Sequence, residues 1–164
     1  MNLSEKARSL VDSLARHQQK IVLAESCTGG MVSAELAKVS GVSQWHCGSA
    51  VTYRNETKMR WLGVDEQTLA QHTAVSLPVA EQMAAGVLAK TPEADIAAAI
   101  TGHFGPQAPD GFDGVTFIGL AWRQGKAISV RAEQFSLRTA SRLQRQAEAV
   151  GAVLDAIERL LDAA

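Results

Sequence analysis

The sequence predicts a three-layer α/β/α domain in which helices cover both faces of a mixed β-sheet. The chain has 164 residues, which suits a single domain over residues 1–164 that buries about two-thirds of its unfolded surface. Helical patterns separate the early apolar strands, as they do where strands run parallel. Two later strands instead flank the turn Arg123-Gln124-Gly125-Lys126, which predicts a hairpin that closes the sheet.

The first half of the chain alternates predicted helices and strands. Residues 3–16 place apolar side chains at helical spacing, and residues 20–24 form a short apolar run typical of a strand buried on both faces. Residues 31–38 are predicted to form a second helix, and residues 45–53 a strand with small side chains in its middle. The polar residues 54–61 are predicted to form only a helical turn.

The second half of the chain predicts the remaining helices and the rest of the sheet. An alanine-rich helix covers residues 76–90, where the Ser76 hydroxyl suits the N-cap position. A long final helix with one apolar face covers residues 139–161. Three strands are predicted between these helices, at residues 95–100, 115–122 and 127–135.

Charge and composition argue against several classes of protein. A net charge of −1 does not suit a nucleic-acid binder or a protein of anionic membrane surfaces, and no apolar stretch is long enough to span a bilayer. The N-terminus lacks the basic and apolar regions of a signal peptide. Cys27 and Cys47 lack the spacing of a zinc site or a disulfide scaffold, and no two histidines have the spacing of a helical metal site. We therefore expect a cytoplasmic protein with reduced thiols, no metal and no cofactor.

Two glycine-bearing loops follow predicted strands and are the first candidates for a ligand site. One is Glu25-Ser26-Cys27-Thr28-Gly29-Gly30, and the other is Thr101-Gly102-His103-Phe104-Gly105-Pro106. Ligands of open α/β sheets bind beyond the carboxyl ends of strands, so the two loops are expected to share one pocket. The first loop would add the N–H groups and the positive dipole end of the helix that follows it. The simpler alternative is that the glycines only allow the chain to turn.

Ser26 is the candidate nucleophile of the first loop, and it needs a base to activate it. Lys58 is one candidate, because a desolvated lysine can lose its proton near neutral pH. Tyr53 is a second candidate, which would relay the proton or orient the serine. The alternatives are that Lys58 is an ordinary solvated lysine, and that Cys27 is either a rival nucleophile or a small packed residue.

Imidazole and guanidinium side chains are the candidates for substrate contacts. His103 lies in the second glycine loop, and it either touches a ligand or is a polar loop residue without a chemical role. Four arginines are dense near the start of the final helix, where they would either clamp a phosphate or carboxylate or form a solvated helix face. These four are Arg131, Arg138, Arg142 and Arg145.

Taken together, these stretches resemble the signature of the CinA C-terminal domain family, which includes nicotinamide-nucleotide amidohydrolases. Residues 24–30 are similar to the family's serine-bearing signature, and residues 53–58 are similar to its Y-x-N-x-x-K stretch. Four further segments follow in the family's order: Leu62-Gly63-Val64, Ala74-Val75-Ser76, Thr101-Gly102 with Gly105-Pro106, and Gly114-Val115-Thr116.

This resemblance implies an enzyme that hydrolyses the carboxamide of nicotinamide mononucleotide, giving ammonia and nicotinate mononucleotide. It implies Ser26 as the nucleophile and Lys58 and Tyr53 as its activating partners, with the choice of base between those two left open. The backbone of residues 28–30 would hold the oxyanion or the phosphate. The partner would be a small-molecule nucleotide, with no nucleic acid and no membrane, and the chain would form a homo-oligomer. The implied substrate-binding residues are Thr28, Gly29, Gly30, Asn55, Thr101, Gly102, His103, Gly105 and Arg138.

Three segments depart from the family's pattern, and all belong to the expected substrate side. His103-Phe104 replaces small apolar residues, residues 107–113 replace a glycine-rich turn, and Ser136-Leu137-Arg138 keeps only the arginine of a G-D-R motif. Two alternatives to the leading hypothesis therefore stay open. One is a non-catalytic module that binds a nucleotide, and the other is an amidase with a different substrate.

Overall fold

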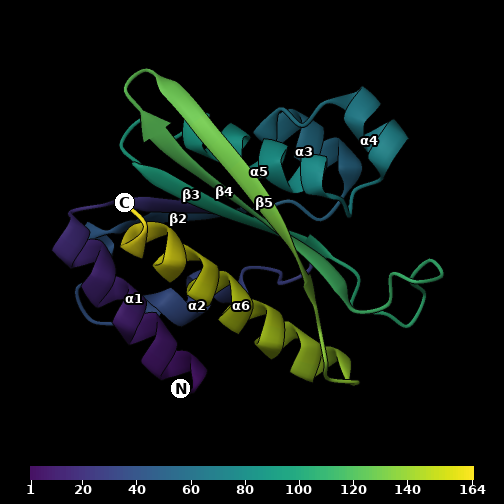
Figure 1. Ribbon diagram of the computed structural model, residues 1–164, viewed down its shortest axis with the longest axis horizontal. Helices are drawn as coiled ribbons and strands as arrows, with labels where there is room; N and C mark the ends of the chain where they lie inside the picture. The colour runs from purple at the N-terminus through teal and green to yellow at the C-terminus, as the bar shows by residue number, and fades with distance from the viewer.

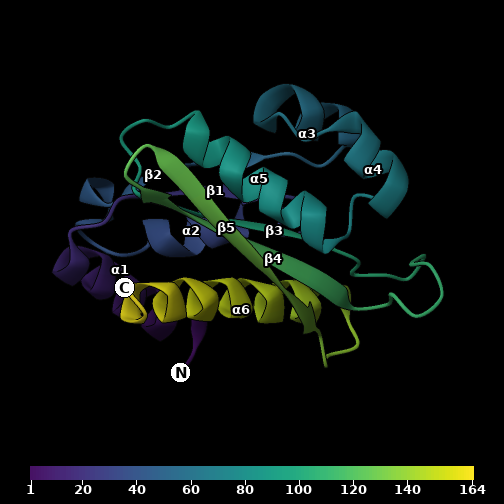
Figure 2. The same cartoon turned by 45° about the horizontal axis from the view of Figure 1, so that its top comes forward.

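A computed structural model of the chain describes residues 1–164 and has the predicted three layers. The helices are α1 (Leu3–His17), α2 (Met31–Ala37), α3 (Asn55–Leu62), α4 (Glu66–His72), α5 (Leu77–Ala89) and α6 (Arg142–Asp162). The strands are β1 (Ile21–Glu25), β2 (His46–Val51), β3 (Ile96–Gly102), β4 (Val115–Gln124) and β5 (Ala127–Ser136), and a short 3-10 helix, η1 (Val42–Gln44), precedes β2. Figures 1 and 2 show α1, α2 and α6 on one face of the sheet and α3, α4 and α5 on the other.

The five strands form one mixed sheet in the order β2-β1-β3-β4-β5, which confirms the predicted fold class. β1 runs parallel to both of its neighbours, whereas β4 and β5 form the expected antiparallel hairpin beside β3. The register pairs Glu25 at the end of β1 with Val51 of β2 and with Ile100 of β3. The carboxyl ends of three parallel strands therefore meet at one edge of the sheet, where a ligand site is expected.

Alternate residues of the central strands serve two cores on opposite faces of the sheet. Along β1, Ile21 and Leu23 join the core beneath α1 and α6, while Val22 and Ala24 join the core beneath α5. β3 follows the same alternation, with Ile96, Ala98 and Ile100 on the first face and Ala97 and Ala99 on the second. All five residues of β1 are buried, because helices cover the strand from both sides, as expected for the parallel part of a sheet.

The observed elements differ from the prediction mainly between β2 and α5. Residues 55–62 form a complete helix, α3, rather than a single turn, and α4 was not predicted at all. α6 begins at Arg142, three residues later than predicted, with Ser141 as its N-cap. None of the helices has both the length and the apolar character that crossing a bilayer would require.

Candidate active site

A cavity of about 310 Å³ opens where the carboxyl ends of β1 and β3 meet. Its wall combines Ser26 and Cys27 after β1, Lys58 of α3, and the loop of residues 101–108 after β3. Tyr53, Ala74, Val75 and Arg142 of α6 also line it. Both glycine-bearing loops contribute to this pocket, although the first does so only through Ser26 and Cys27. The volume of the pocket lies within the range of small-molecule sites.

A second, larger cavity of about 570 Å³ lies at the other end of the sheet, between the C-terminal ends of α1 and α6. Trp122 and Arg131 stack there, with 5.9 Å between the guanidinium carbon and the ring centroid. Arg123, which also lines it, donates to the carbonyl oxygens of Leu88, Thr91 and Ala94. No serine or cysteine lines this cavity, so the candidate nucleophile and base lie in the smaller one.

Ser26 and Lys58 are in direct contact inside the smaller cavity. The Lys58 Nζ lies 3.0 Å from the Ser26 Oγ, and both residues are buried, with Lys58 only 1% exposed. Nζ also donates to the backbone carbonyl oxygens of Thr52 at 2.9 Å and Tyr53 at 3.3 Å. Lys58 is therefore not a solvated surface lysine, and its distance from the hydroxyl is that of a base and its nucleophile.

Backbone contacts fix the geometry of this pair. The Ser26 N–H donates to the carbonyl of Ile100 in β3, and the Thr52 N–H donates to the carbonyl of Glu25 in β1. The segment that carries the Lys58 acceptors is thereby tied to β1, the strand that Ser26 directly follows. Burial lowers the pKa of Lys58, although the neighbouring Cys27 opposes this shift. A lowered pKa brings the lysine closer to the neutral form that can accept a proton.

Glu25 occupies the N-terminal end of α2, which the sequence suggested as an anion site. Its buried carboxylate accepts hydrogen bonds from the N–H groups of Val32 and Ser33, at 2.9 and 3.2 Å. It also accepts from the hydroxyls of Thr28 and Ser49, at 2.7 and 2.8 Å. The Glu25 carboxylate therefore already binds these N–H groups at the positive end of α2, and it stabilises the turn that carries Ser26.

Cys27 is a packed residue beside Ser26. It is buried in the core beneath α1 and α6. Burial raises the pKa of its thiol to about 12. A cysteine nucleophile acts as the thiolate, so this thiol is a poor rival to Ser26.

Tyr53 lines the same cavity, but its hydroxyl is directed toward α6 rather than toward Ser26. The Tyr53 side chain is exposed, and its hydroxyl accepts a hydrogen bond from the Arg142 Nη2 at 3.0 Å. Its backbone carbonyl, in contrast, accepts from Lys58. In this geometry Lys58 is the only one of the two activating candidates that contacts the serine.

The second glycine loop contributes its predicted residues to the cavity wall. Thr101, Gly102, His103 and Gly105 all line it, and the Thr101 hydroxyl donates to the carbonyl of Ala74 at 2.8 Å. Gly102 is required by close packing, since a Cβ there would lie 2.4 Å from the Thr116 Cγ2. Burial lowers the pKa of His103, so its imidazole is neutral at pH 7.

The sequence of nearly the whole chain, residues 3–161, matches the model of the CinA C-terminal domain family. The chain belongs to the CinA C-terminal domain family. It is 40% identical over 141 residues to the nicotinamide-nucleotide amidohydrolase PncC of Escherichia coli (strain K12), covering 83% of this chain and 81% of that protein. It is also 37% identical to a CinA-like protein of Prochlorococcus marinus (strain MIT 9301), over 93% of this chain and 36% of that longer protein.

Solved structures of the same superfamily have the same fold. A CinA superfamily protein from Klebsiella pneumoniae superposes with a TM-score of 0.92 at 28% identity, covering 100% of both chains. The competence/damage-inducible protein CihA from Agrobacterium tumefaciens superposes with a TM-score of 0.90 at 29% identity, covering 99% of this chain and 96% of that one. The five-stranded mixed sheet with its two helical layers is therefore the CinA C-terminal fold.

Several predicted substrate-binding residues of this CinA C-terminal domain lie outside the cavity wall. Thr28, Gly29, Gly30 and Asn55 do not line it. The Thr28 hydroxyl binds Glu25, and the Gly29 N–H closes the turn on the Ser26 carbonyl at 3.0 Å. The proposed oxyanion role of these backbone groups stays a prediction.

Arg138 also lies outside the cavity, and Arg142 stands in the place expected for it. The connection from β5 to α6 turns so that the exposed Arg138 lines a separate hollow, with its N–H donating to Glu148 at 2.9 Å. Arg142 reaches the cavity from the first turn of α6. In the sequence, Arg142 is only one of four clustered arginines. The signal that separates it from the others is the Ser141 N-cap, which sets the helical phase of α6.

Proposed function

We propose that this chain is a nicotinamide-nucleotide amidohydrolase that uses Ser26 as its nucleophile and Lys58 as its base. The observation that carries the proposal is the 3.0 Å contact between the Lys58 Nζ and the Ser26 Oγ inside a small-molecule cavity. The name of the 40% identical relative from Escherichia coli supports the same reaction. The reaction is hydrolysis of a carboxamide C–N bond.

The proposed mechanism is acyl transfer in two steps. The Ser26 Oγ attacks the amide carbon while Lys58 accepts the hydroxyl proton, which forms the new C–O bond. Lys58 then returns this proton to the departing nitrogen, so that the C–N bond breaks and ammonia leaves an acyl-serine. Water attacks the acyl-serine with Lys58 again as the base, which releases the carboxylic acid and restores Ser26.

Arg142 is the residue that we assign to the phosphate of the nucleotide. Its guanidinium lines the cavity and is held by two neutral acceptors, the Gly105 carbonyl at 3.1 Å and the Tyr53 hydroxyl. No carboxylate pairs with it, so its charge is available to an anionic substrate. In this proposal, Tyr53 positions Arg142 and is not the base.

The proposed enzyme needs no metal, because the general base and the nucleophile are both side chains. No group of three or more His, Cys, Asp or Glu residues could hold a metal ion. The resemblance also implies a cytoplasmic homo-oligomer, and both features belong to this proposal.

Ammonia release from nicotinamide mononucleotide by the purified chain tests the proposal. We expect release by the wild-type chain and a loss of several orders of magnitude in the Ser26→Ala variant, because the nucleophile is removed. The variant should keep the fold, since the backbone bonds of Ser26 do not need its hydroxyl. Equal rates in the two proteins, or no release by either, would refute it.

An amidase with a different substrate is the second candidate. His103 and Phe104, which depart from the family's pattern, both lie in the cavity wall and therefore affect which molecule fits. A panel of phosphorylated and unphosphorylated amides separates the two candidates. Preference for an amide without a phosphate would favour this second function. The non-catalytic alternative predicts a ligand-induced rise in melting temperature without ammonia release, and the buried Ser26–Lys58 contact argues against it.

A further inference from the structure

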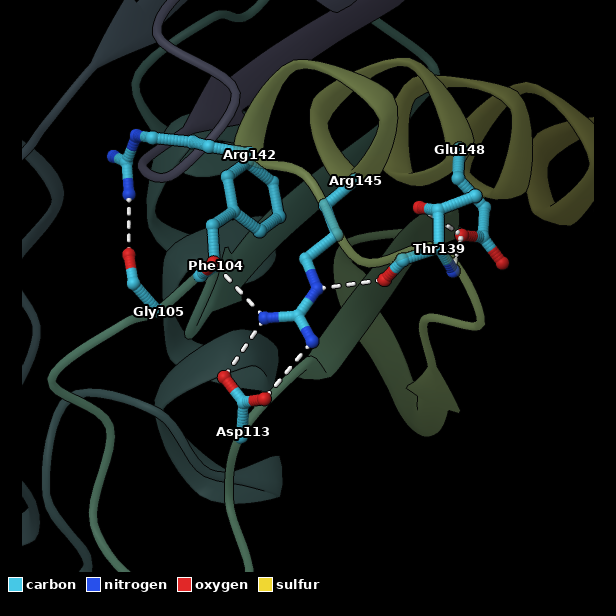
Figure 3. A network of polar contacts seen from close by, with 7 residues as sticks. All are labelled: Phe104, Gly105, Asp113, Thr139, Arg142, Arg145 and Glu148. Atoms are coloured by element: carbon cyan, nitrogen blue, oxygen red, sulfur yellow. Dashed lines mark hydrogen bonds and ion pairs between the residues drawn. The ribbon is translucent and has the colours of Figure 1, made fainter.

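Arg145 of α6 ties two segments of the cavity region together. We call residues 103–113 the substrate loop, because its first residues line the cavity. The Arg145 Nη1 donates to the Phe104 carbonyl in this loop at 3.0 Å, and the Nε donates to the Thr139 carbonyl before α6 at 2.9 Å (Figure 3). One side chain therefore links the loop, the helix and the connection that enters the helix.

The far end of the substrate loop returns to the same guanidinium. The two Asp113 carboxylate oxygens accept from the Arg145 Nη1 and Nη2 at 2.7 and 2.9 Å, in a parallel bidentate pair (Figure 3). The hydrogen bonds from Arg145 lower the pKa of Asp113, so the carboxylate is ionised at neutral pH. Since Phe104 and Asp113 both bind Arg145, the loop is closed at both ends on one residue.

Gly105 shows that the backbone is fitted closely to this ion pair. A Cβ at this position would lie 2.6 Å from the Asp113 Oδ1 and 3.1 Å from the Arg145 Nη1. The φ angle of Gly105 is +73°, in the left-handed region that favours glycine. Its carbonyl accepts from the Arg142 Nη1, so this residue binds one arginine and leaves room for the other.

The helix that carries the two arginines is itself held in place. Glu148, one turn further along α6, accepts hydrogen bonds from the N–H and the hydroxyl of Thr139 at 3.1 and 2.8 Å (Figure 3). The Arg142 guanidinium lies 5.7 Å from the centroid of the Phe104 ring, the residue whose carbonyl Arg145 holds. The position of Arg142 in the cavity therefore depends on the placement of the substrate loop.

We propose that Arg145 and Asp113 are positioning residues that hold the substrate loop, and through it Arg142, in the arrangement that selects a phosphorylated amide. This inference rests on the proposed function and deepens it, since it names the pair that fixes substrate preference. Neither residue lines the cavity, so both act through Phe104, Gly105 and Arg142.

The Asp113→Asn variant tests this inference, because it keeps the size of the side chain and removes its charge. We expect KM for nicotinamide mononucleotide to rise about tenfold with kcat within about twofold, as a displaced binding group predicts. KM for nicotinamide riboside, which lacks the phosphate, should change less than about twofold. Arg145→Lys keeps the charge but cannot form the bidentate pair, and combining it with Asp113→Asn should add little further change.

Glu133→Gln is the matched control, because it breaks another exposed ion pair of the chain, with Arg159. We expect this variant to match the wild type with both substrates. Asp113→Asn kinetics that equal those of the control, or a fall in kcat without a change in KM, would overturn the inference.

Hydrogen–deuterium exchange separates failure of this inference from failure of the proposed function. If the wild-type chain releases no ammonia from the nucleotide, the proposed function fails, and exchange then decides whether the ion pair holds the loop. Exchange in residues 103–113 that is faster in Asp113→Asn than in Glu133→Gln supports the positioning role. Equal exchange in the two variants overturns it.

Discussion

Lys58 is the residue on which the proposed chemistry of this site depends. Burying a lysine without a carboxylate partner disfavours its charged form, and its Nζ has only the Ser26 hydroxyl and two backbone carbonyls as partners. Residue types and spacing could propose Lys58 as a base but could not decide between a buried and a solvated lysine. Lys58 is buried because α3 directs its side chain inward, toward Ser26 at the end of β1.

The lowered pKa of Lys58 predicts the pH dependence of the rate. In the proposed mechanism the neutral amine is the active form, so kcat/KM should rise with pH until the pH passes this pKa, which lies below the ordinary value of 10.5. Lys58→Met should lower kcat by about a thousandfold or more, whereas Lys126→Met, in the exposed β4–β5 turn, should leave the profile unchanged. A wild-type rate that falls as pH rises from 6 to 9 would contradict the assignment of Lys58 as base.

The same shift predicts how stability depends on pH. The unfolded chain binds the Lys58 proton more tightly than the folded chain does, because burial lowers only the folded-state pKa. Lys58 therefore makes the free energy of unfolding rise with pH between its folded-state pKa and about 10.5. Urea unfolding of the wild type across this range should show that rise relative to Lys58→Met, which has no proton to lose. Parallel pH profiles for the two proteins would show that Lys58 is not desolvated.

At the scale of single elements, the prediction failed where a buried residue was charged. The buried residues of α3 are Lys58 and Leu62, one helical turn apart. A hydrophobic pattern counts lysine as polar, so it detects only one of these two buried positions. α4 buries only Leu69, so it has no apolar periodicity to detect. The helices with wide apolar faces, α1, α5 and α6, were predicted within three residues at each end.

α5 shows a packing constraint that its alanine-rich sequence does not reveal. A Cβ at Gly86, in the middle of this helix, would lie 1.8 Å from the Leu62 carbonyl oxygen at the end of α3. Where α5 packs against the sheet, a Cβ at Gly119 of β4 would lie 2.1 Å from the Ala80 carbonyl oxygen. Glycine thus lets α5 approach both the sheet and the helix that carries Lys58.

Alanine substitutions at two helical glycines should therefore have opposite effects on stability. Alanine is better than glycine in a helix by about 1 kcal/mol, but at Gly86 this gain is outweighed by the clash with backbone, so Gly86→Ala should destabilise the protein by about 1–3 kcal/mol. At Gly151 in α6 the nearest atom is the Leu3 Cδ2 at 3.4 Å, an ordinary contact. Gly151→Ala should therefore be neutral or stabilising by up to about 1 kcal/mol. Urea unfolding measures both, and a stabilising Gly86→Ala would refute the close approach.

At the scale of the whole molecule, the site assembles from segments that are far apart in the sequence. The meeting of the two glycine-bearing loops could be predicted, because the carboxyl ends of parallel strands share one edge of the sheet. The place of Arg142 could not, because it depends on how residues 137–141 turn between β5 and α6. Hydrogen bonds from the backbone of Arg138 and Thr139 to Glu148 fix that turn. These partners are nine and ten residues apart in the sequence, and no pattern of residue types indicates that they pair.

One sheet shared by two cores predicts that the chain unfolds as one domain. Leu10 lies in the core beneath α1 and α6 and Met83 in the core beneath α5, both fully buried. Leu10→Ala and Met83→Ala should each cost about 2–5 kcal/mol, and each should lower the melting temperature in a single transition. The reason is that neighbouring residues of β1 and β3 belong to opposite cores, so neither core can be lost while the sheet persists. Tryptophan fluorescence and far-UV circular dichroism should give coincident transitions in both variants. Two separate transitions in either variant would show instead that the helical layers unfold independently. The chain would then consist of two cooperative units rather than one.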